Sequence, residues 1–142
     1  DAGMPGISEP GDPLITSAIE QGITVIPVPG PAAVTTLLSV SGLPTDKFIF
    51  EGFLPRKSGQ RKKRLEELKD EERTMVFYES PHRLQDMLEE AKEIFGDRKV
   101  CVGRELTKKY EEILYLSLAE AIIHFTKRAP KGEFTLVIAG AK

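Results

Sequence analysis

The sequence predicts an α/β fold in which helices flank a mixed sheet. Short apolar runs rich in β-branched residues recur along the chain and are typical of strands. Between them lie longer segments whose apolar residues repeat at helical spacing. Glycine or proline stands at many of the junctions, where the chain has to turn.

The composition is that of an ordinary globular protein, and it excludes several classes. Of 142 residues, 40% are hydrophobic and 30% are charged, and the formal net charge is -2. No apolar run approaches the roughly 18 residues of a membrane-spanning helix, so we expect no membrane segment. One cysteine, Cys101, excludes an internal disulfide, and with two histidines it provides no ligand set for a metal. We therefore expect no metal and a reducing, cytoplasmic location.

Residues 1–46 predict the later part of an α/β domain. Asp12-Pro13 is typical of an N-cap followed by a first helical residue, and Gly22 is typical of a helix end. The continuous apolar run 23–27 favours a buried parallel strand. The predicted elements are a loop, a helix, a strand, a turn and a helix, over residues 1–13, 13–21, 23–27, 29–31 and 32–41.

Residues 47–142 predict a second α/β domain with the order β-α-β-α-β-β-α-β. Ser80-Pro81 favours a helix start, and Ser117 with Glu120 has the spacing of a capping box. The predicted strands cover residues 48–53, 74–79, 99–104, 110–116 and 133–139. The predicted helices cover residues 58–70, 81–95 and 118–127.

Several junctions between these elements carry residue types that suit a ligand site. Small residues there let a ligand approach the backbone, and the carboxyl ends of strands are where ligands bind in open α/β sheets. Turns that bind nothing explain the same residue types about equally well. These junctions are residues 1–11, 27–33, 78–83 and 103–109.

Residues 56–64, RKSGQRKKR, concentrate positive charge, with six Arg or Lys in nine positions. Such a cluster suits contact with phosphates. Acidic residues follow it, so a solvated, charged helix is the alternative. No aromatic residue is interleaved, so the cluster gives no support for base stacking.

Six segments in a fixed order resemble a known family: DAGMPGISEPG, VIPVPGPAA, FEGFLPRK, VFYESPHR, GRELTKKYEE and KGEFTLVIAG. Together they are similar to the ribosomal RNA small-subunit methyltransferase I family, within the tetrapyrrole methylase superfamily. The resemblance covers essentially the whole chain. It implies two α/β domains with S-adenosyl-L-methionine in the cleft between them. It also implies 2′-O-methylation of a cytidine ribose in 16S ribosomal RNA near the decoding centre, a homodimer, and no metal.

The resemblance also implies roles for individual residues. A ribose hydroxyl is a poor nucleophile that a general base assists, and the candidates are Glu105 and Glu79. The implied cofactor contacts are Asp1, Ala2, Gly3, Ile7, Ala32, Ala33, Tyr78, Glu79, Leu106, Glu133 and Phe134. The hypothesised contacts to small-subunit RNA are Arg56, Lys57, Arg61, Lys62, Lys63, Arg64, Arg83, Arg104 and Lys108.

The beginning of the chain leaves alternatives open. It starts at Asp1 inside a glycine- and proline-rich loop, so we expect an N-terminally truncated chain with an incomplete first domain. We also expect the activity of this truncated chain itself to be reduced or absent. Methylation of a tetrapyrrole or another small molecule is the alternative enzymatic function, and a non-catalytic binding fragment is the alternative outside catalysis.

Overall fold

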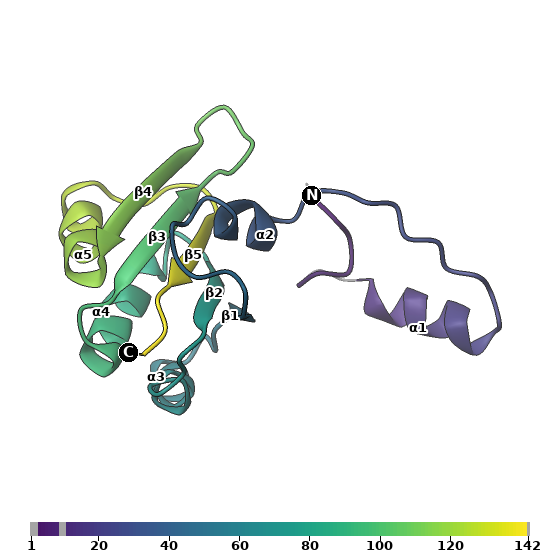
Figure 1. Ribbon diagram of the computed structural model, residues 1–142, viewed down its shortest axis with the longest axis horizontal. Helices are drawn as coiled ribbons and strands as arrows, with labels where there is room; N and C mark the ends of the chain where they lie inside the picture. The colour runs from purple at the N-terminus through teal and green to yellow at the C-terminus, as the bar shows by residue number, and fades with distance from the viewer. Residues whose placement is uncertain (1–2, 9–10, 142) are drawn as a thin grey trace.

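The structure, a computed structural model, describes residues 3–8 and 11–141. Its centre is a five-stranded sheet with the order β1-β2-β5-β3-β4 (Figure 1). β1 and β2 run parallel, whereas the other neighbours pair antiparallel, so the predicted mixed sheet is confirmed. The strands are β1 (Phe48–Phe53), β2 (Thr74–Glu79), β3 (Lys99–Arg104), β4 (Glu112–Ser117) and β5 (Phe134–Ile138).

Helices cover both faces of this sheet (Figure 1). Met75 and Phe77 of β2 pack with the helices of one face, and Val76 between them packs with the helix of the other. Because both faces are covered, β5 is buried along its whole length, and all of its residues except Thr135 are apolar. The first face carries α3 (Ser58–Glu67), α4 (Leu84–Phe95) and α5 (Leu118–Lys127), and the second carries α2 (Ala33–Leu38).

The predicted domain boundary between residues 46 and 47 falls between α2 and β1. α2 nevertheless packs on the sheet that the later strands form, through Val34 and Leu37. The division of the chain into residues 1–46 and 47–142 therefore stays a prediction.

Over residues 47–142, local signals predicted the correct element types but less exact boundaries. The capping box is confirmed, because the Glu120 N–H donates to Ser117 Oγ at 3.2 Å and the Ser117 N–H donates to Glu120 Oε2 at 2.8 Å. The helix start at Ser80-Pro81 is wrong, since these residues form a turn and α4 begins at Leu84. The turn is fixed by a hydrogen bond from the Ser80 N–H to the Glu79 carboxylate at 2.7 Å. The predicted helix 58–70 extends three residues beyond the end of α3, and the predicted strand 110–116 starts two residues and stops one residue before β4 does.

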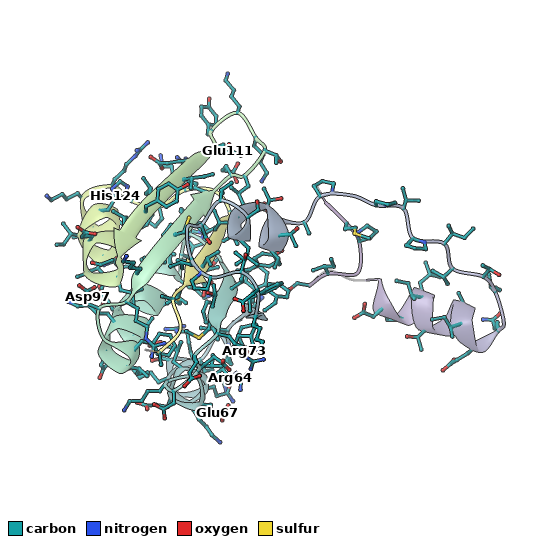
Figure 2. All side chains as sticks on the ribbon, in the orientation of Figure 1. Arg64, Glu67, Arg73, Asp97, Glu111 and His124 are labelled. Carbon is teal, nitrogen blue, oxygen red and sulfur yellow. The ribbon has the colours of Figure 1, made fainter. Side chains whose placement is uncertain are left out.

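Residues 11–31, which we call the arm, extend away from the packed part of the molecule (Figures 1 and 2). The arm begins with α1 (Asp12–Glu20), which has no buried residue. The predicted strand over 23–27 is wrong, because this segment is extended but pairs with no strand among the described residues. Ile26 is 77% exposed there. An apolar, β-branched sequence favours extended backbone, but a strand also needs a neighbour to bond its N–H and C=O groups.

Candidate functional site

A cleft of about 360 Å³ opens at the carboxyl ends of the parallel strands β1 and β2. The other walls are the loop 3–8, the start of α2, the turn 106–108 after β3, and the start of β5. β3 and β5 are antiparallel, so the end of one lies beside the start of the other. The topology therefore brings the four junctions singled out in the sequence to one place.

The cleft collects the predicted cofactor contacts. Asp1 and Ala2 lie outside the described residues, and the other nine all line the cleft: Gly3, Ile7, Ala32, Ala33, Tyr78, Glu79, Leu106, Glu133 and Phe134. Sequence reasoning did not assign Met4, Ser8, Pro31, Thr36, Phe53, Ser80, Pro81, Thr107 and Thr135, which line it too. Helical spacing was a usable signal for Thr36, which follows Ala33 by three positions.

The glycine- and proline-rich loop is held against the rest of the cleft by its backbone. The Met4 N–H donates to the Pro31 carbonyl at 2.8 Å. Gly3 has φ +109°, and a Cβ there would lie 3.2 Å from the same Pro31 oxygen. On the other side, Gly52 forms a bulge in β1 with φ +62°, where a Cβ would lie 3.3 Å from Ser8 Oγ. Glycine at both positions thus permits the close approach that shapes this wall.

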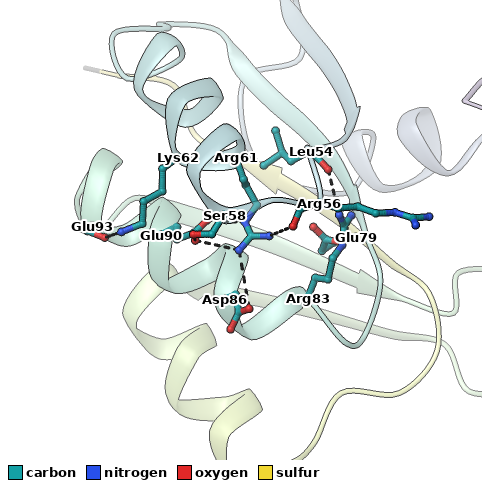
Figure 3. A network of polar contacts seen from close by, with 10 residues as sticks. All are labelled: Leu54, Arg56, Ser58, Arg61, Lys62, Glu79, Arg83, Asp86, Glu90 and Glu93. Carbon is teal, nitrogen blue, oxygen red and sulfur yellow. Dashed lines mark hydrogen bonds and ion pairs between the residues drawn. The ribbon is translucent and has the colours of Figure 1, made fainter.

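Glu79 is the last residue of β2 and presents a buried carboxylate to the cleft. Its Oε1 accepts hydrogen bonds from the Ser80 N–H at 2.7 Å and from Arg83 Nε at 2.8 Å. Arg83 is itself fixed, since its Nη1 donates to the Leu54 carbonyl at 3.2 Å (Figure 3). Glu79 Oε2, in contrast, is buried and has no hydrogen-bond partner among the described residues. A buried polar atom without a partner is costly, so this oxygen is suited to accept from a ligand.

Glu105, the other predicted carboxylate, accepts hydrogen bonds that stabilise the turn after β3. It has φ +47°, and its Oε1 accepts from the Glu133 N–H at 2.8 Å and from Lys108 Nζ at 3.1 Å. The Glu133 N–H, and after it the Lys108 ammonium, lower the pKa of the Glu105 carboxyl. Its neighbours Leu106 and Lys108 line the cleft, whereas Glu105 does not. Because Glu79 lines the cleft and Glu105 does not, the geometry favours Glu79 over Glu105 for proton transfer.

One hypothesised RNA contact, Arg61, needs correction, because the structure buries it. Arg61 is 3% exposed and bonds Glu90 through two guanidinium nitrogens, at 2.5 and 3.0 Å (Figure 3). Glu90 also accepts from Ser58 Oγ at 2.6 Å. Arg61 points into this network between α3 and α4, so it joins two helices and is not available to RNA. The run of positive charges in the sequence gave no sign that one arginine of the cluster faces inward.

The remaining basic residues lie at the surface, and most have acidic partners. Lys62 pairs with Glu93 at 2.7 Å, and Arg64 pairs with Glu51 and Glu67, both at 2.8 Å. Exposed pairs of this kind exchange readily with other anions and do not prevent phosphate contact. Arg56, Lys57 and Lys63 are exposed. Arg83, Arg104 and Lys108 lie near the cleft, with Glu79, Glu112 and Glu133 as partners.

Other kinds of site find little support in the described part of the chain. Burial raises the pKa of the Cys101 thiol to about 11, which disfavours the nucleophilic thiolate. Among residues 3–8 and 11–141, no group of acidic, histidine and cysteine side chains is arranged to hold a metal ion. No helix within these ranges has the length and apolar character to span a membrane.

Comparison with protein families identifies a match over most of the chain. A family model described as Tetrapyrrole (Corrin/Porphyrin) Methylases matches residues 1–122. A "Ribosomal RNA small subunit methyltransferase I" of Halalkalibacterium halodurans is 54% identical over 141 residues, covering 99% of this chain and 48% of the relative. One of Thermotoga maritima is 50% identical over 140 residues, covering 99% of this chain and 63% of the relative. The chain thus spans roughly half of the relatives that it matches.

Solved structures share the fold at low sequence identity. The crystal structure of the methyltransferase CobJ has a TM-score of 0.71 at 19% identity, covering 99% of this chain and 63% of that one. A uroporphyrin-III C-methyl transferase from Thermus thermophilus, complexed with S-adenyl homocysteine, has a TM-score of 0.62 at 17% identity. It is covered over 62% of its length, and this chain over 95%. These likenesses concern the fold, which is the α/β architecture that the sequence predicted.

Proposed function

Because this chain belongs to the tetrapyrrole (corrin/porphyrin) methylases, we propose that its cleft is the S-adenosyl-L-methionine site of a ribosomal RNA methyltransferase. The observation that carries the proposal is the convergence of all nine described cofactor candidates on one cleft. The RNA substrate is supported by relatives at 50–54% identity that are named Ribosomal RNA small subunit methyltransferase I. Since the chain spans about half of those relatives, the proposal concerns the activity of the whole protein.

The residues of the cleft fit this cofactor. A volume of about 360 Å³ lies within the range of roughly 300–1,000 Å³ that small-molecule sites occupy. Tyr78 and Phe53 line the cleft, and their rings are in edge contact with their centroids 5.6 Å apart. Aromatic rings attract cations such as a sulfonium. Ala32 and Ala33 leave room at the start of α2 for a flat group. Gly3 to Ser8 and Leu106 would enclose the ligand from two sides.

When bound, S-adenosyl-L-methionine supplies an activated methyl group. We propose that the acceptor is the 2′-hydroxyl of a cytidine near the decoding centre of the small subunit. The contribution of this chain is alignment of the two reactants and exclusion of water from the cleft. Glu79 Oε2, which is buried and has no hydrogen-bond partner in the described part of the chain, accepts the proton of the hydroxyl, and Arg83 fixes the carboxylate through Oε1. The whole protein is further proposed to act in the cytoplasm as a homodimer on the small subunit or its RNA.

Calorimetry with S-adenosyl-L-methionine tests the cofactor site. We expect this chain to bind the cofactor, and Ala33→Leu to weaken binding by about tenfold or more, because the larger side chain enters the cleft. Ala18→Leu in α1 is the matched control, since it adds the same atoms outside the cleft, and its affinity should equal the wild type. Absence of binding, or equal affinities of the three proteins, would contradict the proposed site.

Methyl transfer tests the substrate. The whole protein is incubated with labelled cofactor and either small ribosomal subunits or a tetrapyrrole, and labelled RNA is digested to nucleosides. We expect label in 2′-O-methylcytidine. Glu79→Gln should still bind the cofactor, and its rate of methyl transfer should fall by about 100-fold or more. Label in the tetrapyrrole alone favours the small-molecule alternative, and cofactor binding without transfer to either substrate favours a non-catalytic protein.

A further inference from the structure

A second cavity of about 310 Å³ lies beside the cleft. The two hollows share Phe134, the first residue of β5, which lines both. Arg104, at the end of β3, pairs with Phe134 across the two strands and lines the second cavity. The two hollows are therefore neighbours, with the buried Phe134 side chain between them.

The charge of the second cavity is positive. Arg104, Arg128 and Lys131 line it together with a single carboxylate, Glu112. Arg128 Nη1 lies 3.2 Å from Glu112 Oε1, and Arg104 Nη1 lies 3.7 Å from Glu112 Oε2, so one carboxylate serves two cations. The Lys131 ammonium has no ion pair within the described ranges, while its carbonyl accepts from Arg104 Nε at 2.6 Å. The three cations exceed the one carboxylate by two positive charges. The carbonyl end of α5 adds only about half a negative charge, so the cavity remains positive.

A further observation at this cavity indicates a missing polar partner. His124, on α5 (labelled in Figure 2), lines the cavity, and its Nε2 is buried without a hydrogen-bond partner among the described residues. Buried ring nitrogens are normally paired, so this atom has a hydrogen bond left to make. A phosphate oxygen accepts hydrogen bonds from imidazole N–H, guanidinium and ammonium groups alike.

We propose that this second cavity binds a phosphate of the RNA backbone, next to the nucleotide whose ribose occupies the cleft. The inference rests on the proposed function, because it requires an RNA substrate. A polymer that places one ribose in the cleft necessarily carries phosphates past its rim, whereas a small-molecule substrate does not. Arg128 and Lys131 thereby become determinants of an RNA substrate, in addition to the basic residues predicted from the sequence.

The test is the salt dependence of binding to a labelled single-stranded oligonucleotide of small-subunit RNA, followed by fluorescence anisotropy between 50 and 200 mM salt. For Arg128→Gln/Lys131→Gln we expect about tenfold weaker binding at 100 mM salt and a slope lower by about 0.7, as for the loss of one phosphate contact. The matched control is Lys92→Gln/Lys99→Gln, which removes two exposed cations that do not line either hollow. The control should keep the wild-type slope, and both double variants should keep the wild-type affinity for S-adenosyl-L-methionine.

NMR of the two histidine rings distinguishes a phosphate of RNA from free inorganic phosphate as the ligand of the cavity. We expect the RNA to shift the His124 signals, and the same concentration of inorganic phosphate to leave them unchanged; His124→Gln assigns the signals. A shift with inorganic phosphate and none with RNA would overturn the proposal in favour of a small anion. If the wild type binds RNA and Arg128→Gln/Lys131→Gln binds it equally well, this inference fails alone. If the wild type binds no RNA, the proposed function fails with it.

Discussion

The ion pair between Arg61 and Glu90 shows how one buried arginine departs from an otherwise solvated cluster. Burial, which is the largest influence, raises the pKa of Glu90, but hydrogen bonds from Arg61 and Ser58 outweigh it, so the pKa lies below its ordinary value. Both side chains are nearly inaccessible, at 4% and 10%. Removing one partner therefore leaves an uncompensated charge in the protein interior, whereas removing both does not.

We expect Arg61→Met to lower the free energy of unfolding by about 3–5 kcal/mol, and Arg61→Met/Glu90→Met to recover most of that loss. Chemical denaturation at neutral pH measures both. The control is Lys62→Ala on the same helix, whose exposed ion pair with Glu93 should contribute little to stability.

Because folding lowers the pKa of Glu90, its contribution to the free energy of unfolding depends on pH. This contribution is complete above the unfolded pKa near 4.3 and disappears as the pH falls through the folded pKa. A wild type that keeps its full advantage over Glu90→Gln below about pH 4 contradicts this account.

At the scale of elements, sequence reasoning succeeded where a local signal agreed with the packing. The short apolar run of β2 predicted a strand, and its residues pack against helices on both faces. The segment 23–27 carried an equally good strand pattern, but pairing is decided by a neighbour, which no local pattern contains. The four junctions singled out in the sequence form most of the walls of the cleft, and the resemblance to a known family supplied the individual cofactor contacts. The burial of Arg61 was not, because it depends on Glu90, 29 residues away in the chain.

Gly103 links an element to the cleft and supplies a prediction at this scale. It lies in β3, where a Cβ would come within 2.8 Å of Leu37 Cδ1 and 3.0 Å of Leu106 Cδ2. We expect Gly103→Ala to destabilise the fold by about 1–3 kcal/mol by overpacking, and to weaken cofactor binding by displacing Leu106. Thermal unfolding and calorimetry measure the two effects. Gly59→Ala is the matched control, since nothing lies within 4 Å of its Cβ, and it should be neutral or stabilising. A Gly103→Ala protein as stable as Gly59→Ala would refute the tight contact.

At the scale of the whole molecule, the core and one wall of the site belong to different parts of the chain. The sheet and four helices bury the apolar residues of the core, whereas the arm leaves Leu14, Ile26 and Val28 at 77–78% exposure. The same part of the chain leads from the loop 3–8 to the start of α2, and both line the cleft. One wall of the candidate site is therefore joined to the rest through a segment that contributes little to the core.

An exposed, extended and apolar segment tends to pair with another chain, so we expect this chain to self-associate with increasing concentration. Ile26→Lys should weaken that association by adding a charge to the segment, and sedimentation velocity over a range of concentrations measures it. The same substitution should leave the free energy of unfolding of the dilute protein within about 0.5 kcal/mol of the wild type, because the side chain is 77% exposed. Ile123→Lys, which places the same charge at a 55% exposed position on α5, is the control and should associate as the wild type does. A wild type that remains monomeric throughout, or an equal effect of both substitutions, would show that the arm is not the surface through which copies meet.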